Sequence, residues 1–200
     1  LLARHSEEVP CCLEDVQVRQ WISMDGPRRV WVEEERGRIL LYASDGEFEE
    51  LVAMARRTEP SASPPEPLGR VTGPLVEDAG LEGLWTDGPD WSLLRSLVLG
   101  RDGASAVLDA RPRAIPVGVV HAAVLHAIVQ ATPHHQLERW DPTLEGRIAW
   151  PVTAPRVELF APIPTQGELR CEVRYDGPST IPGLPSFRAQ ILREDGLEST

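Results

Sequence analysis

The feature that most limits the fold is a single apolar helix in a chain otherwise marked by strands and turns. Residues 117–131 contain no proline and, after Gly118, no glycine, and small or aliphatic residues occupy nearly every face of the predicted helix. A helix that is apolar on all sides is buried. Pro116 and Pro133 flank the segment, which is typical of a helix start and stop. The rest of the chain must therefore enclose this helix.

The residues before the helix favour antiparallel strands. Apolar and polar residues alternate along several short segments, and turn signals such as Asp45-Gly46 separate them. The segment 47–57 is ambiguous, because its apolar spacing fits a helical face, whereas its place in a series of hairpins favours a strand. We interpret it as a strand. The other strands predicted before the helix are residues 13–22, 30–32, 39–42, 93–99 and 104–108.

Three more strands are predicted after the helix, at residues 147–160, 168–175 and 186–193, the first of them broken by Pro151 and Pro155. The chain has 16 glycines and 19 prolines in 200 residues, which disfavours a helix bundle. One apolar helix among many strands predicts an α+β fold, in which antiparallel sheets wrap around a central buried helix.

A proline-rich segment marks the one clear boundary in the chain. Residues 58–68 contain the run Pro64-Pro65-Glu66-Pro67 among small residues, which is typical of a stiff, solvated linker. We therefore predict a first half at residues 1–57, a linker at 58–68 and a second half at 69–200.

The overall charge restricts the choice of partner. The formal net charge is −11, and all 20 basic residues are arginine. This balance argues against nucleic acid or an anionic membrane as the main partner. No apolar run approaches the roughly 20 residues of a membrane span, and no signal segment is recognisable. We expect a cytoplasmic protein.

The cysteines indicate neither a disulfide framework nor a metal site. Cys11 and Cys12 are adjacent, which strains a bond between them, and Cys171 is far away in the sequence. An odd count without regular spacing indicates unpaired thiols in a reducing compartment. Zinc sites need paired cysteine or histidine at set spacings, and none is present. We predict no metal.

The helix carries the polar residues with the most chemical interest. His126 and Gln130 are four residues apart, so they share one face, and His121 precedes them by about a turn. One interpretation is a histidine that is hydrogen-bonded within the core. The other is an acid or base with glutamine as its orienting neighbour. Fingerprints for dinucleotide binding, phosphate loops and the Gly-x-Ser-x-Gly nucleophile turn are absent.

The order of several short motifs resembles the dehydratase domain of modular or iterative polyketide synthases. The resemblance runs from about residue 13 to residue 196 and rests on segments 13–18, 87–91, 121–130, 159–164 and 187–196. It implies a double hot-dog fold, in which each of two units has a curved antiparallel sheet around a central helix. It also implies removal of water from a β-hydroxyacyl chain carried on an acyl carrier protein.

The resemblance also implies site residues. His126 occupies the position of the usual catalytic aspartate and Gln130 matches its neighbour, so these two are the candidate catalytic residues. Asp87 replaces a tyrosine that usually precedes Gly88-Pro89, and these three are candidate substrate-binding residues.

The usual first-half motif, His-x-x-x-Gly-x-x-x-x-Pro, is not found in this sequence. His5 is the only nearby histidine, but Val9 and Glu14 stand where the motif has glycine and proline. The role is therefore not assigned to His5. Burial favours the neutral form of an imidazole, which is a better base than acid. A proton shuttle, a double-bond shift or ring closure by oxa-Michael addition tolerates His126 better than simple loss of water.

The leading functional hypothesis is thus a dehydratase-like enzyme that acts on β-hydroxyacyl or enoyl chains. The substrate would be held on the phosphopantetheine of a carrier protein, with no other cofactor, and the expected partners are neighbouring synthase domains and a second copy in a homodimer. One alternative is a degenerate domain that serves architecture or docking without chemistry. Another is a stand-alone hot-dog binding protein or thioesterase-like protein.

Overall fold

The computed structural model describes most of the chain in several stretches. The chain divides into two compact units, Leu1–Pro64 with Pro151–Pro162, and Pro65–Trp150 with Ile163–Thr200, and each is treated by itself below. The described residues are 10–20, 29–73, 75–77, 93–111, 122–134, 136–148, 151 and 153–193.

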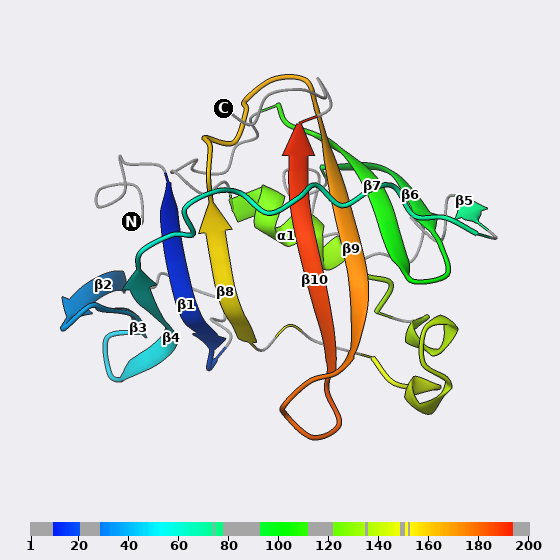
Figure 1. Ribbon diagram of the computed structural model, residues 1–200. Helices are drawn as coiled ribbons and strands as arrows, with labels where there is room; N and C mark the ends of the chain where they lie inside the picture. The colour runs from blue at the N-terminus through cyan, green and yellow to red at the C-terminus, as the bar shows by residue number, and fades with distance from the viewer. Residues whose placement is uncertain are drawn as a thin grey trace. The chain divides into compact units, whose positions relative to one another are not determined.

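The first unit contains a five-stranded antiparallel sheet with the strand order β2-β3-β4-β1-β8 (Figure 1). Its strands are β1 (Cys11–Val18), β2 (Arg29–Glu35), β3 (Arg38–Ser44), β4 (Glu49–Thr58) and β8 (Thr153–Leu159). The tightest connection joins β2 to β3 through Arg36 and Gly37, both of which have positive φ values, 51° and 75°. A two-residue loop of this kind matches the twist of the strands that it joins.

The ambiguous segment before the proline-rich region is a strand, β4, as predicted. It lies at the centre of the sheet and pairs with β3 on one side and with β1 on the other. Its irregular apolar spacing has a structural cause, because Leu41 pairs with Ala53 while the next residue, Tyr42, pairs with Leu51. Val52 is therefore the extra residue of a bulge, and such a bulge interrupts the alternation of faces along a strand.

Strand β8 corrects the predicted domain boundaries. Residues 151–162 were assigned to the second half, but β8 pairs with β1 and belongs to the first unit. The predicted break at Pro155 is also wrong. Because β8 is an edge strand, a residue without an N–H group can face away from its only neighbour.

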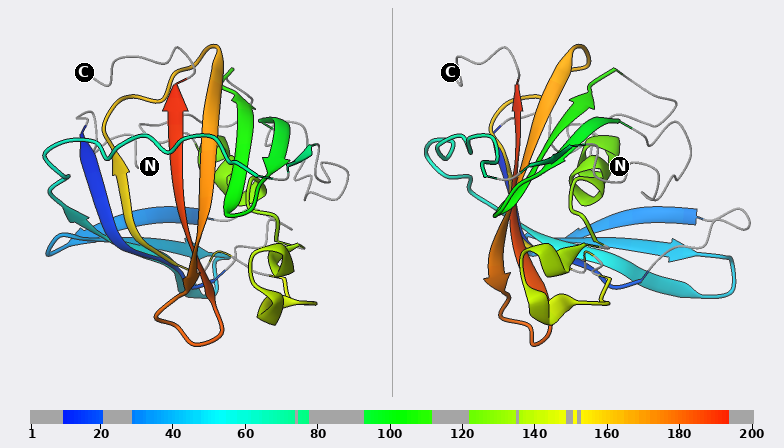
Figure 2. Two further views of the ribbon diagram at one scale, coloured as in Figure 1. Left: turned by 45° about the vertical axis from the view of Figure 1, so that its right-hand side comes forward. Right: turned by 90° about the vertical axis from the view of Figure 1, so that its right-hand side faces the viewer.

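The second unit contains a second five-stranded antiparallel sheet with the strand order β10-β9-β7-β6-β5. Figure 2 shows helix α1 against one face of this sheet. The strands are β5 (Val76–Glu77), β6 (Leu94–Leu99), β7 (Gly103–Asp109), β9 (Glu168–Pro178) and β10 (Pro185–Arg193). Within the described residues, the helices are α1 (Ala122–Gln130) and two short 3-10 helices, η3 (Leu137–Arg139) and η4 (Pro142–Leu144).

The core of the second unit lies between α1 and its sheet. Alanines on the helix, including Ala123 and Ala127, are fully buried and let the helix approach the strands closely. Leu125 on the same helix is 41% exposed. The prediction from the sequence that the helix is buried on every side is therefore wrong for the described helix. The predicted start of the helix, at residues 117–121, lies outside the described residues. The buried strand residues that meet the helix in this cluster are Leu97, Leu99, Ala104, Ala106, Leu108, Leu169, Cys171 and Val173.

Ion pairs cover one face of the first sheet and attach the start of the proline-rich segment. Arg56 contacts Glu14 at 2.6 Å, and Arg156 contacts both Glu14 and, at 2.8 Å, Glu158. The backbone N–H of Ser61 donates to Glu158 Oε1 at 2.6 Å. The segment that follows β4 is thus held to the sheet by a charged side chain of β8.

This network predicts a dependence of stability on pH. The hydrogen bond from Arg156 lowers the pKa of Glu158 from 4.5 to about 2. The resulting stabilisation is fully present above the unfolded-state pKa and is lost as pH falls through about 2. We expect Glu158→Gln to lower the free energy of unfolding by about 1 kcal/mol at about pH 6 and to have little effect at about pH 2.

Urea unfolding of both proteins at the two pH values measures the difference. Glu34→Gln, which changes an exposed acid on β2, is the control and should leave the profile unchanged. If Glu158→Gln lowered the free energy of unfolding equally at both pH values, the ionised Glu158 carboxylate would not be the source of the stabilisation.

Candidate functional site

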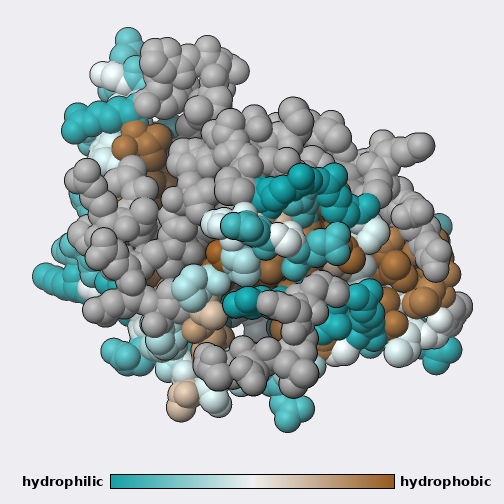
Figure 3. All heavy atoms as spheres, turned by 90° about the horizontal axis from the view of Figure 1, so that it is seen from above, coloured by the Kyte–Doolittle hydropathy of each residue, from teal (hydrophilic) through white to brown (hydrophobic). Residues whose placement is uncertain are grey.

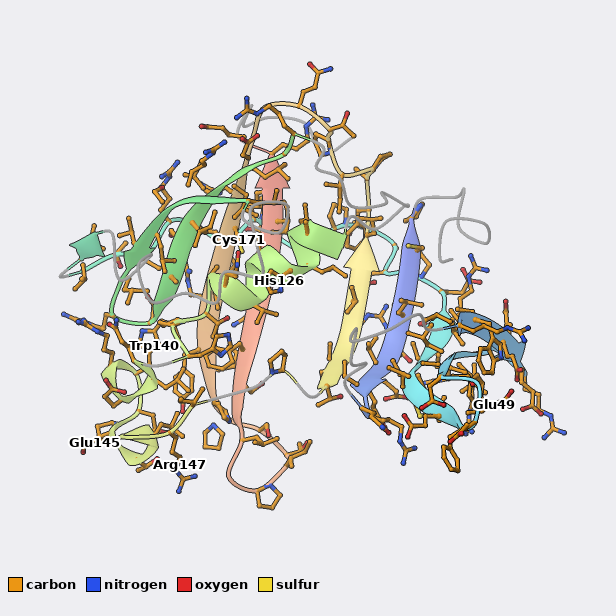
Figure 4. All side chains as sticks on the ribbon, turned by 180° about the vertical axis from the view of Figure 1, so that it is seen from behind. Glu49, His126, Trp140, Glu145, Arg147 and Cys171 are labelled. Carbon is orange, nitrogen blue, oxygen red and sulfur yellow. The ribbon has the colours of Figure 1, made fainter. Side chains whose placement is uncertain are left out.

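Helix α1 carries both predicted catalytic residues. Gln130 is 6% exposed and His126 is half-buried, and the four-residue spacing puts them one turn apart on the same side of the helix. His126 Nε2 and Gln130 Oε1 are both shielded from solvent. Figure 4 labels His126 on α1 and Cys171 on β9, in the sheet against which the helix packs. The arrangement offers an imidazole beside a buried amide.

The end of α1 is fixed by side chains that follow it. Thr132 Oγ1 donates to the carbonyl oxygen of Ile128 at 3.2 Å. His134 Nε2 lies 2.7 Å from the carbonyl oxygen of Val129, so this ring nitrogen donates to the last turn of the helix. These bonds satisfy carbonyls that a helix end leaves without partners. The turn that carries Gln130 is therefore held in place.

Several large apolar side chains of the described residues are exposed at the surface. Leu125 on α1 is 41% exposed and directly precedes His126. Other large hydrophobic side chains also reach the surface, among them Phe48 and Ile148, and Figure 3 shows hydrophobic residues in brown beside hydrophilic ones in teal. Isolated exposed apolar residues are common in proteins.

The predicted substrate-binding residues cannot be placed beside this pair. Asp87, Gly88 and Pro89 lie outside the described residues, as does His121. The roles of His126, Gln130 and these three residues therefore stay predictions. In the part of the chain that the structure describes, no group of three or more histidine, cysteine or acidic residues could hold a metal ion.

The cysteines are free thiols. Cys171 is fully buried on β9, and burial raises its pKa to about 12. A thiol that stays protonated is a poor nucleophile. Cys171 is therefore a packing residue of the core.

Asp109 is a buried acid that the sequence did not single out. It ends β7, is 5% exposed and binds Arg111 and Arg95. The hydrogen bond from Arg111 holds the pKa of Asp109 well below its usual range, with a further contribution from Arg95. The carboxylate stays ionised, so it fixes the end of the strand and is unsuited to deliver a proton.

A second unforeseen cluster fixes the segment after α1. Tyr175 on β9 donates its hydroxyl to Asp141 Oδ2 at 2.7 Å, and its ring packs against Trp140 and Phe187 at centroid distances of 6.2 and 5.7 Å. Burial and the bond to Asp141 raise the pKa of Tyr175 to about 12. The tyrosine therefore stays neutral and holds the 3-10 helices to the sheet.

Comparison with known proteins gives matches among solved structures. No family model matches the sequence, and no curated protein does. The dehydratase domain of RzxB from Pseudomonas fluorescens matches with a TM-score of 0.64 and 23% identity over 94% of this chain and 71% of that one. A dehydratase domain from the CurJ module of curacin polyketide synthase matches with a TM-score of 0.68 and 13% identity over 98% of this chain and 74% of that one.

A third similar solved structure is that of an enzyme with a different activity. It is a trans-acyltransferase polyketide synthase enoyl-isomerase, with a TM-score of 0.72 and 12% identity over 97% of this chain and 81% of that one. The matches extend over nearly all of the chain. The protein therefore has the double hot-dog fold of polyketide synthase dehydratase domains, which confirms the predicted fold class. The same fold accommodates both a dehydratase and an isomerase.

No helix within the described ranges is long and apolar enough to cross a membrane.

Proposed function

We propose that this chain moves protons on acyl chains that are bound to an acyl carrier protein. The observation that carries the proposal is the position of His126 one turn before Gln130 on α1, in a fold shared with dehydratase and enoyl-isomerase domains. The substrate is a β-hydroxyacyl or enoyl thioester of phosphopantetheine, and no other cofactor takes part. The carrier protein and neighbouring synthase domains are the proposed partners.

Two reactions are consistent with these residues. In loss of water, a base removes the α-proton and the β-hydroxyl leaves with a second proton, so a Cα=Cβ bond and one water form. In a double-bond shift, a base removes the γ-proton and a proton is added at the α-carbon, with no change of mass. His126 takes or returns the proton, and the Gln130 amide orients the imidazole or the substrate oxygen.

The double-bond shift fits these residues better. In the double-bond shift one imidazole can take the γ-proton and, once protonated, supply a proton at the α-carbon, and no leaving group has to be protonated. His126 stands where an aspartate is usual in the resembling family, and a neutral imidazole is the better base.

The proposal is tested with two substrates, a β-hydroxyacyl carrier protein and an enoyl carrier protein. Mass spectrometry follows loss of water from the first, and chromatography of the released acyl chain separates double-bond isomers of the second. We expect isomerisation of the enoyl chain, which is lost in His126→Ala. If both substrates are recovered unchanged, the chain is a structural or docking domain without chemistry.

One substitution distinguishes the two reactions. His126→Asp restores the carboxyl group that is usual at this position in the resembling family, and a carboxylic acid is the better donor to a leaving hydroxyl. We expect the ratio of isomerisation to water loss to fall by at least about tenfold, in proportion to the lost base strength. The same two assays give this ratio. A ratio equal to that of the unchanged protein would contradict the assigned role of His126.

A further inference from the structure

A fully buried glutamate lies on the face of the second sheet that points away from α1. Glu172 on β9 is 0% exposed, while its sequence neighbours Cys171 and Val173 pack in the core on the helix side. Side chains alternate between the faces of a strand, so Glu172 shares the opposite face with Arg170 and Arg174. A strand with charges at every second position predicts a solvated face. Here that face is covered.

Three side chains surround the buried carboxylate. Ser105 Oγ on β7 donates to Glu172 Oε2 at 2.6 Å. Arg174 Nη2 lies 3.2 Å from the same oxygen, and Arg170 Nε lies 3.3 Å from Glu172 Oε1. A buried charge is tolerated only when it is paired and hydrogen-bonded. The carboxylate therefore fixes the direction of the Arg174 guanidinium and of the serine hydroxyl through Oε2, and it attracts Arg170 to Oε1 as an ion pair.

These same groups bind the backbone of the proline-rich segment. Arg170 Nη2 donates to the Leu68 carbonyl oxygen at 3.2 Å, and Arg174 Nη2 donates to the carbonyl oxygen of Gly69. Ser105 Oγ accepts a hydrogen bond from the Val71 N–H at 2.9 Å.

Gln190 on the neighbouring strand β10 adds two bonds to the segment. Its Oε1 accepts from the Leu68 N–H at 2.7 Å, and its Nε2 donates to the Glu66 carbonyl oxygen at 3.1 Å. In Figure 1 the segment that leads to β5 runs across the front of β10 and β9. It crosses the strands instead of pairing with them, so side chains satisfy its backbone groups.

We infer that this face of the second sheet is a binding site for an extended, proline-containing peptide, and that the chain's own residues 66–71 occupy it as a strap. Glu172 positions the two arginines that donate to carbonyl oxygens of the strap. Gln190 forms hydrogen bonds with the strap backbone on either side of Pro67, at Glu66 and Leu68. Prolines reduce the conformational freedom that an unbound segment would have, which favours binding of the strap. The strap thus includes residues 66–68, the end of the segment predicted as a solvated linker, whereas the side chains of residues 61–67 are exposed. This inference is independent of the proposed enzymatic activity.

Limited digestion with trypsin tests the strap directly, because Arg70 lies within it. Cleavage of the bond between Arg70 and Val71 requires the strap to leave the sheet, since Val71 is buried and its N–H is bonded to Ser105. Two variants weaken the binding of the strap to the sheet in different ways. Glu172→Gln removes the buried counter-charge of both arginines, and Gln190→Ala removes the two bonds from β10 without altering the buried carboxylate.

We expect both variants to raise the rate of cleavage after Arg70 by about tenfold, the factor that corresponds to loss of one charge-assisted hydrogen bond or two neutral ones. Arg188→Gln is the matched control. It removes an ion pair between β10 and Asp176 in which Arg188 is 60% exposed, and it should leave the cleavage rate unchanged. Fragment masses identify the bond that is cut.

Amide hydrogen exchange supplies a second readout that does not depend on protease. In the unchanged protein the Leu68 and Val71 amides should exchange slowly, and Gln190→Ala should accelerate exchange at Leu68. The inference is overturned if Gln190→Ala changes neither cleavage after Arg70 nor exchange at Leu68. It is also overturned if cleavage rises equally at all arginines, because that pattern means global unfolding.

Discussion

Replacing His126 with alanine is expected to reduce the rate of acyl-chain isomerisation by on the order of 100- to 10,000-fold, the range for loss of a positioned acid or base. The imidazole is the only titratable group among the described residues of α1. It lies beside the buried amide of Gln130, and Ala123 and Ala127 hold this helix tightly against the second sheet. The rate is measured with the enoyl carrier protein by chromatography of the released chain.

A neighbouring substitution separates chemistry from folding. Leu125→Ala changes an exposed side chain on the same helix and should lower the rate far less than His126→Ala does. Leu125→Ala should unfold at a temperature close to that of the unchanged protein, because Leu125 is exposed. The unfolding temperature of His126→Ala is measured beside it, so that loss of the acid or base is distinguished from loss of folding. If His126→Ala retained more than about a tenth of the rate, His126 would not act as the acid or base.

Replacing Gly103 with alanine is expected to destabilise the second unit by about 3 kcal/mol, at the upper end of the range for overpacking. Gly103 begins β7 and pairs with Arg174 on β9. A Cβ atom there would overlap the backbone carbonyl oxygen of Val173 and lie 3.0 Å from Arg174 Cδ. Backbone cannot yield as a flexible side chain can, so the two strands must separate. The free energy of unfolding in urea measures the change.

Gly69 offers a matched control in the same unit. A Cβ at Gly69 would meet nothing within 4 Å, so Gly69→Ala should change the free energy of unfolding by less than about 1 kcal/mol. If Gly103→Ala changed the free energy of unfolding as little as Gly69→Ala, β7 and β9 would not approach each other closely at this position.

Much of the fold was predictable from short-range pattern. The hairpin signals placed the strands of the first sheet to within a few residues, and the apolar run located the only helix of more than one turn in the described chain. The pattern could not show that β8 pairs with β1, because that contact joins residues more than 130 positions apart. Nor could it show the bulge at Val52, since an added residue makes strand spacing resemble helix spacing.

The candidate site was predictable only in part. The spacing of His126 and Gln130 identifies a shared helix face from sequence alone. The buried acids Glu172 and Asp109 were missed, because alternating or terminal charges on a strand are normally solvated. The burial of Glu172 depends on a segment that is distant in sequence, the strap. A local pattern does not report such coverage.

The most direct test of the proposed function is solvent deuterium uptake. The enoyl carrier protein is incubated in D₂O with the unchanged protein, with His126→Ala or with no protein, and the mass of the acyl chain is followed. Addition of water and ring closure place a solvent proton on carbon. During repeated, reversible isomerisation the proton held by His126 exchanges with solvent, so this reaction also adds deuterium. The account predicts deuterium in the acyl chain with the unchanged protein and almost none with His126→Ala. Equal incorporation in all three samples would contradict it.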